Sequence, residues 1–368
     1  MSRQIDRPNP PLPRRALLAA SLLGGGGSLA ALAAASSPAR ACSRIVWNDN
    51  GRAILVARSM DWVNPMPTDL YALPKGMARD GMTGPSTLRW TSRHGSLVAV
   101  STREPASGAS DGMNEAGLTG SLLWLSESDY GKYDPTARSL SVGQWLQYYL
   151  DEFATVEDAV RATQAAPFQV VTGRFDGRAV AVHLALTDAT GDTAVFEYLG
   201  ARLTIHHGRQ YTVMTNSPPY DQQLAQLRQY KGFGGDKPLP GTSDAADRFV
   251  RGAYYVSNLP KPLDYREAVA AMLSVIRNVS APFGEADPAR PYVSVTRWRT
   301  VADVTNRIYY FESSTSPNLV WVRLAALDFA QESGVRRLDL VGHPDRVGDV
   351  TDQFLPAKPF TVAPPDLT

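Results

Sequence analysis

Cys42 is the residue with the clearest chemical consequence, because of the residues that precede it. The chain has 368 residues and a single cysteine. Residues 1–41 have the pattern of a secretory signal peptide and end in Ala39-Arg40-Ala41, an A-x-A cleavage site. Cleavage there would make Cys42 the first residue of the mature protein. Its thiol would then be a nucleophile, and its free α-amine could act as the general base of an amide hydrolysis.

The leader has the parts of an export signal. Its first segment is positive, and residues 16–35 form a charge-free run dominated by alanine and leucine. The adjacent Arg14 and Arg15 before this run resemble a twin-arginine signal, which predicts a periplasmic protein. A run of about twenty apolar residues could also span a bilayer. Its glycine and alanine content makes it only mildly hydrophobic, however, and a cleavage site follows, so we expect no stable membrane anchor.

A cysteine directly after a leader is also the pattern of a lipoprotein anchor. Lipoprotein signals usually place a leucine-type residue three positions before the cysteine, with small residues between. Ala39 and the bulky, charged Arg40 occupy those places here. This departure favours a soluble exported protein. A lipid-anchored periplasmic binding protein without catalysis is the alternative from another class, because a lipidated cysteine carries a blocked amine.

Composition limits the partners. Loss of residues 1–41 removes five arginines and one aspartate, so 37 basic and 36 acidic side chains become 32 and 35 in the remaining 327 residues. A near-neutral chain without a basic run lacks the charge pattern of nucleic-acid binding. No cluster of histidine, cysteine and carboxylate residues has metal-ligand spacing, so we expect no metal and no other cofactor. A single cysteine excludes an internal disulfide. The length fits one domain over residues 42–368.

The elements that must position Cys42 begin with strands. Apolar runs at residues 44–47 and 53–58 flank Asn48 to Gly51, whose Asn-Gly step predicts a tight hairpin turn. Further strands are expected at 96–101, 118–125, 179–203, 211–215, 292–301, 306–312 and 319–324. Helices are expected at 141–153, 155–163, 220–230, 244–255 and 265–276, the second opened by a capping box at 155–158. Strand groups separated by paired helices predict an α+β layered domain.

Six short motifs, in order along the chain, resemble the choloylglycine hydrolase family. Cys42-Ser43-Arg44 is followed by a hairpin and by Arg58 and Asp61, which match the family's Arg-x-x-Asp pair. Residues 111–118 are similar to its Gly-Met-Asn-Glu-x-Gly-Leu segment, and residues 215–218 to its Thr-Asn-x-Pro motif. Residues 248–251 resemble its Ser-Arg-Phe-x-Arg segment, although Asp247 replaces the serine, and residues 296–312 resemble its late strand pair.

The resemblance implies an N-terminal nucleophile hydrolase with a four-layer αββα fold, which cleaves a linear amide through an acyl thioester. Cys42 would be the nucleophile, and Arg58 would favour its thiolate. Asp61 would hydrogen-bond the α-amine. The side-chain amide of Asn216 and the backbone N–H of Trp124 would be the oxyanion donors. Arg248 would complete the polar network, with Arg251 as an open alternative.

Two tryptophans bear on the substrate. Trp62 and Trp124 look like the pair found in the Gram-negative branch of the family, which has penicillin V and N-acyl homoserine lactone acylase activities. Two indoles could form a slot for a flat phenoxyacetyl group or an acyl chain. A conjugated bile salt hydrolase of the same family is the alternative. A papain-type protease is disfavoured, because no context of that kind surrounds Cys42.

Two further points stay open at this level. The segment between Asn216 and Arg248 is shorter than in the bile salt hydrolases, where it includes a subunit-contact loop in some members, so a homotetramer and a homodimer are both compatible with the sequence. Removal of the leader could be the work of a signal peptidase or of autoproteolysis.

Overall fold

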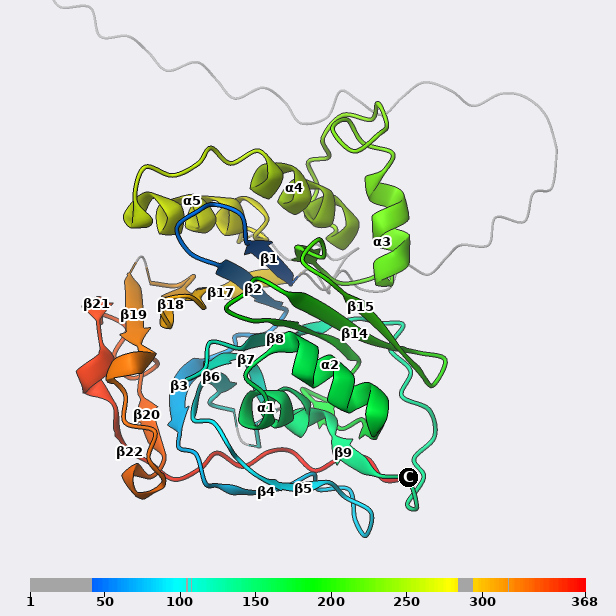
Figure 1. The fold of residues 1–368 in the computed structure, drawn as a ribbon, viewed down its shortest axis with the longest axis vertical. Coiled ribbons are helices and arrows are strands. Elements are labelled where there is room, and N and C mark those ends of the chain that lie inside the picture. The colour runs from blue at the N-terminus through cyan, green and yellow to red at the C-terminus, as the bar shows by residue number, and fades with distance from the viewer. Residues whose placement is uncertain (1–41, 104, 107, 284–293, 317) are drawn as a thin grey trace, which may run out of the picture. The chain divides into compact units, whose positions relative to one another are not determined.

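Two stacked β-sheets form the middle of the structure, and helices cover their outer faces (Figure 1). The computed structural model describes residues 42–103, 105–106, 108–283, 294–316 and 318–368, and all of them belong to one compact unit. None of the helices in these ranges is long and apolar enough to cross a membrane. The leader lies outside the described residues, so its removal stays a prediction.

Cys42 directly precedes β1, one of the inner strands of the first sheet. The seven strands of this sheet run in the order β16-β1-β2-β17-β18-β19-β21. Their bounds are β16 (Val213–Met214), β1 (Ser43–Trp47), β2 (Leu55–Trp62), β17 (Val295–Asp303), β18 (Ile308–Ser313), β19 (Leu319–Arg323) and β21 (Gly348–Asp349). β1 pairs antiparallel with β2, and Ser43 lies opposite Ser59. This register places Cys42 beside the last residues of β2.

The second sheet has nine strands, in the order β15-β14-β13-β8-β7-β6-β3-β20-β22. Their bounds are β15 (Arg202–His207), β14 (Thr193–Leu199), β13 (Val182–Thr187), β8 (Thr119–Trp124), β7 (Ala109–Asn114), β6 (Ser96–Ser101), β3 (Thr68–Leu73), β20 (Arg336–Leu338) and β22 (Leu355–Pro356). Short strand pairs lie outside both sheets: β4 (Ala78–Asp80) with β5 (Arg89–Thr91), β9 (Ser139–Ser141) with β10 (Gln169–Val171), and β11 (Arg174–Phe175) with β12 (Arg178–Ala179).

The helices lie on opposite outer faces of the two sheets. α1 (Val142–Glu152) and α2 (Val156–Ala165) pack on the second sheet, whereas α4 (Ala245–Ser257) and α5 (Tyr265–Asn278) pack on the first, with α3 (Tyr220–Leu227) against α4 (Figure 1). Thr155 Oγ1 accepts the Asp158 N–H at 3.2 Å, which confirms the N-cap half of the capping box predicted for α2. The layers therefore follow the order α, β, β, α, which confirms the predicted four-layer α+β fold.

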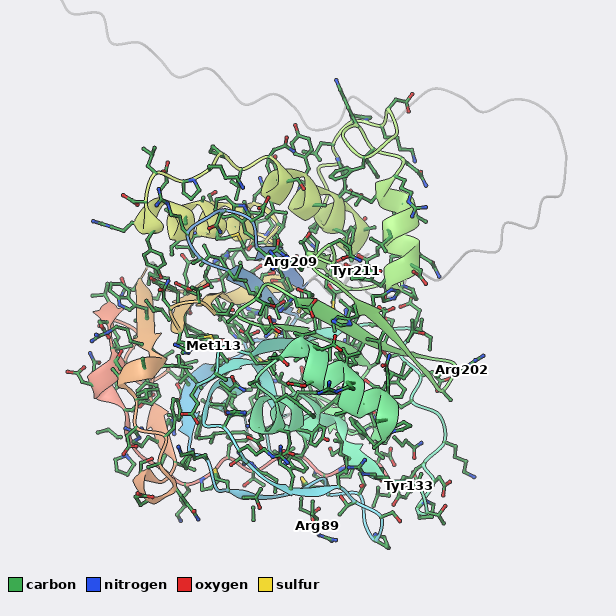
Figure 2. All side chains as sticks on the ribbon, in the orientation of Figure 1. Arg89, Met113, Tyr133, Arg202, Arg209 and Tyr211 are labelled. Atoms are coloured by element: carbon green, nitrogen blue, oxygen red, sulfur yellow. The ribbon has the colours of Figure 1, made fainter. Side chains whose placement is uncertain are left out.

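Side chains fill the space between the sheets (Figure 2). Leu97, Ala99 and Met113 from the second sheet belong to the same buried cluster as Val56 and Ala57 of β2. Burial of one such side chain stabilises the fold by about 1.5–3 kcal/mol relative to exposure. The apolar contact therefore supplies the adhesion between the two sheets.

One carboxylate ties the two sheets together by polar contacts. Asp111 of β7 accepts hydrogen bonds from Thr300 of β17 at 2.9 Å and from Tyr309 of β18 at 2.5 Å, and Ser121 of β8 donates to its other oxygen. A buried carboxylate with three donors is well satisfied. Because the donors lie on both sheets, the tie fixes one sheet relative to the other.

The structure corrects the predicted tight hairpin after β1. Residues 48–54 form a longer loop, and β2 starts at Leu55. The buried Asn50 side chain fills its interior, donating to Trp47 O at 3.2 Å and Ala53 O at 2.7 Å. A side chain that supplies these bonds replaces the backbone pairing of a two-residue turn. Of the strand predicted at 292–301, residues 292 and 293 lie outside the described residues, and β17 begins at Val295.

Candidate active site

The Cys42 sulfur lies against the backbone of Asp61. Cys42 is 4% exposed. The Asp61 N–H donates to Sγ at 3.5 Å, and the thiol lies 3.8 Å from the Asp61 carbonyl oxygen. Both contacts follow from the pairing of β1 with β2, which brings the start of one strand beside the end of the other. Two backbone groups on a rigid strand therefore fix the position of the sulfur.

Asn216 bridges the nucleophile and the second sheet. Its Oδ1 accepts the Cys42 N–H at 2.6 Å and Arg248 Nη2 at 2.9 Å, and its Nδ2 donates to Trp124 O at 2.7 Å. Two donors on Oδ1 fix the orientation of the amide, so Nδ2 must face Trp124. An amide nitrogen has two hydrogens, and the second is available to a substrate oxygen. The geometry suits the predicted oxyanion role of Asn216.

Trp124 presents its backbone on the same side. Leu125 N–H donates to Ala181 O, and Trp124 lies opposite Val182 in the β8–β13 register. Because hydrogen-bonded and non-hydrogen-bonded pairs alternate in an antiparallel ladder, the Trp124 N–H and C=O point away from β13. That side holds Asn216. The Trp124 backbone and the Asn216 side chain therefore lie on the same edge of β8, and the oxyanion role of the Trp124 N–H stays a prediction.

Arg248, and not Arg251, contacts the nucleophile. Arg248 is completely buried, and its Nη1 donates to Cys42 O and to Ser43 Oγ, both at 2.6 Å. Arg251 Nη1 instead donates to two carbonyl groups of the loop before α4, at Pro240 and Thr242. The alternative that the sequence left open is resolved in favour of Arg248 as the contact.

A glycine lets α4 bring Arg248 to Cys42. Gly252 lies one turn after Arg248 on the same face of the helix. A Cβ atom at Gly252 would stand 3.1 Å from Ile45 Cδ1 in β1, closer than side chains normally pack. The missing side chain allows helix and strand to approach, and the guanidinium then reaches the backbone of Cys42.

Arg58 lies between the sheets and faces the same cavity as Cys42. Its Nη2 donates to Leu122 O at 2.9 Å, and its guanidinium carbon stands 4.7 Å above the Trp298 ring, a cation–π contact. Its Nε and Nη1 atoms are buried without a hydrogen-bond partner. A buried cation with two unused donors is an electrostatic partner for negative charge that develops in the cavity.

Arg58 lowers the pKa of the Cys42 thiol, which is the predicted direction, but burial and Asp61 raise this pKa by more. Burial raises the pKa of Cys42, and the nearby Asp61 charge raises it further, whereas Arg58 and Arg248 lower it. The sum leaves the pKa of this thiol above its usual value. Arg58 therefore does not maintain a standing thiolate in the full chain, and attack by Cys42 requires a base.

Asp61 is a buried carboxylate that can accept further hydrogen bonds. Ser59 Oγ donates to its Oδ2 at 3.4 Å, and its Oδ1 is buried without a partner. The bond predicted between Asp61 and the Cys42 amine is not formed here. In the full chain Cys42 N belongs to a peptide bond, and its single hydrogen goes to Asn216. Burial raises the pKa of Asp61 to about 6, although Arg248 and Thr296 act to lower it.

Asp61→Asn is expected to stabilise a chain in which Ala41 still precedes Cys42. The pKa of Asp61 rises from 3.8 to about 6 on folding, so the folded state binds the proton more tightly than the unfolded state. Wild-type stability therefore falls as pH rises from 4 to 6, by up to about 3 kcal/mol. An asparagine side chain is uncharged, so its burial does not carry the cost of ionising a buried carboxylate. Urea unfolding at pH 4 and pH 8 should show a gain in the variant at pH 8 only.

Asp69→Asn is the matched control for that experiment. Asp69 is also fully buried, but it accepts hydrogen bonds from Arg337 at 2.7 Å and from the backbone of Leu340 and Val341. Loss of a partnered carboxylate is expected to cost about 3 kcal/mol at pH 8. An Asp61→Asn variant as unstable as Asp69→Asn at pH 8 would contradict the assignment of Asp61 as an under-partnered charge.

An aromatic wall closes the cavity beside Cys42. The Trp62 ring lies 5.7 Å from the Trp124 ring at 51° and 5.8 Å from Phe175 at 52°. The two indoles contact each other at an angle and both line the cavity, so their predicted slot for an acyl group stays a prediction. The residues that line the cavity are Cys42, Arg58, Met60, Trp62, Met66, Thr68, Ser101, Ala109, Ser110, Leu122, Trp124, Val142, Phe175, Val180 and Val182.

Asp176 holds this wall in place, a role that no sequence motif predicted. Its Oδ2 accepts Trp62 Nε1 at 3.0 Å and Asn64 Nδ2 at 2.6 Å, and its Oδ1 accepts Arg103 at 3.0 Å. It lies with Phe175 on the β11–β12 hairpin. Hydrogen bonds from Asn64 and Trp62 help lower its pKa, with Arg103 adding to the effect. A short hairpin with no motif gives no sequence signal of this role.

A buried histidine supports Asn216 from behind. His183 of β13 lies 2.8 Å from Glu197 Oε1 through Nδ1 and 2.9 Å from Thr215 O through Nε2. A carbonyl oxygen only accepts, so Nε2 carries a proton and donates to it. Glu197 also accepts the Tyr220 N–H at the start of α3. The pair thus fixes the residue before Asn216, a role that sequence patterns did not indicate.

One group of possible metal ligands exists elsewhere in the described ranges. Glu157, Asp192 and His207 place ligand atoms within 4.8 Å of one another, and none of the three lines the Cys42 cavity. His207 Nε2 lies 2.7 Å from Asp192 and 3.8 Å from Glu157, so ion pairing accounts for the cluster.

Comparison with known proteins places the chain in a family. The sequence profile of linear amide C–N hydrolases, choloylglycine hydrolase family, matches residues 42–340, so the match begins at Cys42. The chain is 41% identical over 351 residues to a penicillin V acylase of Pectobacterium atrosepticum, which covers 89% of this chain and 93% of the relative.

Solved structures agree. A penicillin V acylase from Agrobacterium tumefaciens superposes with a TM-score of 0.79 at 44% identity, over 87% of this chain and 99% of that one. A mutant of the conjugated bile acid hydrolase from Clostridium perfringens gives 0.67 at 19% identity over 78% and 94% of the two chains, a likeness of fold alone. The family predicted from the motifs is confirmed. The chain belongs to the choloylglycine hydrolase family and is a linear amide C–N hydrolase.

Proposed function

We propose that the mature protein begins at Cys42, is exported to the periplasm by the twin-arginine route, and hydrolyses acyl amides of the penicillin V or N-acyl homoserine lactone type. One observation carries the proposal. The nitrogen, carbonyl and sulfur of Cys42 are all held by polar groups, at the wall of an aromatic cavity. The family match that begins at Cys42 supports the same starting residue.

Attack by the sulfur is the first step. Cys42 Sγ bonds to the amide carbon of the substrate, and the thiol proton passes to the α-amine, whose ordinary pKa is about 7.7–8.0. The carbonyl oxygen gains negative charge. The second hydrogen of Asn216 Nδ2 and the Trp124 N–H are the donors for this oxyanion. Asp61 Oδ1, without a partner in the full chain, accepts a hydrogen from the new ammonium group.

Collapse of the tetrahedral intermediate releases the amine. The C–N bond breaks, the ammonium proton goes to the leaving nitrogen, and the acyl group stays on Cys42 as a thioester. Water then attacks the same carbon while the α-amine takes one of its protons. The C–S bond breaks, the acid leaves, and the proton returns to the sulfur. Arg248 holds Cys42 O throughout, so the nucleophile keeps its position.

The cavity indicates the acyl group. Its lining is largely aromatic and aliphatic, and Arg58 is the one charged side chain among the lining residues that the structure describes. Such a surface suits a phenoxyacetyl ring or an alkyl chain, which packs against its aromatic and aliphatic side chains. A relative named for penicillin V hydrolysis at 41% identity supports this choice.

A three-substrate panel tests the proposal. A chain that starts at Cys42 should hydrolyse penicillin V or a long-chain N-acyl homoserine lactone with a kcat/KM at least about tenfold above that for glycocholate. Released amine or homoserine lactone, measured by chromatography, gives the rates. Trp62→Ala should raise KM for the preferred substrates, whereas Trp321→Ala, a change outside the cavity, should not. Faster hydrolysis of glycocholate would refute the assignment of the aromatic wall to these acyl groups.

A further inference from the structure

The short hairpin of β11 and β12 ends in a turn whose backbone does not account for the charge of Asp176. Phe175 lies opposite Arg178, so Asp176 and Gly177 are the two turn residues. Their φ angles of 51° and 76° are both positive, as a type I′ turn requires. Glycine, asparagine and aspartate all adopt such angles. The turn therefore explains a small residue at position 176 but not a negative charge.

The carboxylate of Asp176 joins this turn to loops that follow strands of both sheets. Its Oδ2 accepts hydrogen bonds from Trp62 at the end of β2 and from Asn64 just beyond it, at 3.0 Å and 2.6 Å. Its Oδ1 accepts one from Arg103, shortly after β6, at 3.0 Å. The Asp176 side chain is 20% exposed and that of Arg103 35%, so water screens the ion pair only in part. A hairpin that belongs to neither sheet is thus attached to both.

The residue before the turn forms part of the wall of the cavity that holds Cys42. The Phe175 ring packs on Trp62, with 5.8 Å between ring centres, and both line this cavity with Cys42. The cavity leaves about 70 Å³ open to the centres of water molecules. One water needs roughly 10–15 Å³ on this measure, so the space is narrow. A long acyl chain can be enclosed only if part of the wall moves, and Phe175 stands on a segment outside the sheets.

We propose that Asp176 is a specificity-determining residue, which limits the length of the acyl group that the Cys42 cavity accepts. The inference rests on the proposed function, because it takes the acyl part of the substrate to lie in that cavity. Three hydrogen bonds hold the tip of the hairpin, and so hold Phe175 against Trp62. Without them the tip loses its attachment to both loops, and Phe175 can move outward with it. Short acyl groups fit while the hairpin is attached, whereas long ones gain from its release.

Hexanoyl and dodecanoyl homoserine lactone test the length limit, because they share the amine part and differ only in the acyl chain. Asp176→Gly removes all three hydrogen bonds and keeps a residue that suits the positive φ. In a chain that starts at Cys42, it should raise the dodecanoyl-to-hexanoyl ratio of kcat/KM about tenfold, the lower end of what a mismatch in an apolar pocket is worth. The change should come through KM for the longer substrate. Each ratio is taken within one variant, so any loss of folded protein cancels.

Asp176→Asn and Asp349→Gly are the matched variants. Asparagine also suits the turn and keeps one acceptor oxygen, so it should give a smaller rise in the ratio. Asp349 likewise pairs with an arginine, Arg323, at 2.6 Å, but it does not line the cavity, so its replacement should leave the wild-type ratio. A ratio in Asp176→Gly that stays or falls, with both amides hydrolysed, would overturn the length limit and leave the proposed function standing. An equal rise in Asp349→Gly would overturn it as well.

Binding measurements decide the length limit if turnover fails. Calorimetry with a Cys42→Ala chain gives the ratio of the two dissociation constants, and Asp176→Gly in the same chain should shift it about tenfold in favour of the dodecanoyl compound. If the wild-type chain hydrolyses neither these amides nor penicillin V, the proposed function fails, and this shift alone decides the role of Asp176. An unchanged ratio of dissociation constants would reject that role.

Discussion

Cys42→Ala is expected to lower kcat/KM for the preferred amide by at least about 10⁴-fold. The variant lacks the sulfur that forms the thioester, whereas Asn216, Arg248 and the cavity remain. A residual rate from oxyanion donors and binding alone would be far below the wild-type value. Single-turnover measurements with enzyme in excess are the appropriate readout, since they detect one reaction per molecule.

Cys42→Ser is the matched variant for this experiment. It keeps nearly the same volume at a buried position and offers an oxygen in place of the sulfur. A hydroxyl is a much weaker acid than a thiol, so an amine is a poor base for it, and the activity should also fall steeply. Equal thermal stability of both variants and wild type would show that folding is intact. Amide hydrolysis that persists in Cys42→Ala would contradict the assignment of Cys42 as the nucleophile.

A single residue retained in front of Cys42 is expected to lower kcat by about 10³-fold, within the range that general base catalysis contributes. Two chains, one that starts at Ala41 and one that starts at Cys42, have the same thiol, cavity and oxyanion donors. They differ in whether the nitrogen of Cys42 is an amide or an amine. Burial and Asp61 raise the pKa of the thiol, so attack needs a base, and the amide nitrogen of the Ala41 chain is not one.

Intact mass must confirm both starting residues, and a small alkylating reagent should label the thiol in each chain. If the Ala41 chain were as active as the Cys42 chain, the α-amine would not be the base, and another group would have to fill that role. The comparison also bears on export, because it would show whether the leader withholds activity until it is removed.

Amphipathic spacing and caps predicted the helices well, whereas two buried strands of six residues were missed. α1 and α5 lie within two residues of the expected ranges. β3 and β7 were not expected, because each carries an aspartate in its interior. Asp69 is satisfied by Arg337, and Asp111 by Thr300 and Tyr309. Those partners are distant in sequence, so the burial of a charge in a strand leaves no local signal.

The candidate site was anticipated where motifs exist and missed where only tertiary packing acts. Cys42, Asn216 and Arg248 converge as the resemblance implied. No pattern distinguished Arg248 from Arg251, because the choice depends on how closely α4 approaches β1. The contacts of His183 and Asp176 join segments that are neighbours only in the folded chain. Leader removal and export stay predictions.

The hydrogen bonds of Asp111, which join the two sheets, bear on how the substrate range of the protein can change. Asn216 joins Cys42 on the first sheet to Trp124 on the second, so the spacing of the sheets sets the alignment of the reacting groups. Phe175, by contrast, reaches the cavity from a hairpin that belongs to neither sheet. Mutation of that hairpin can change the shape of the acyl pocket while Cys42, Asn216 and Trp124 keep their relative positions. Substrate range and catalytic alignment are therefore separable traits, open to independent selection.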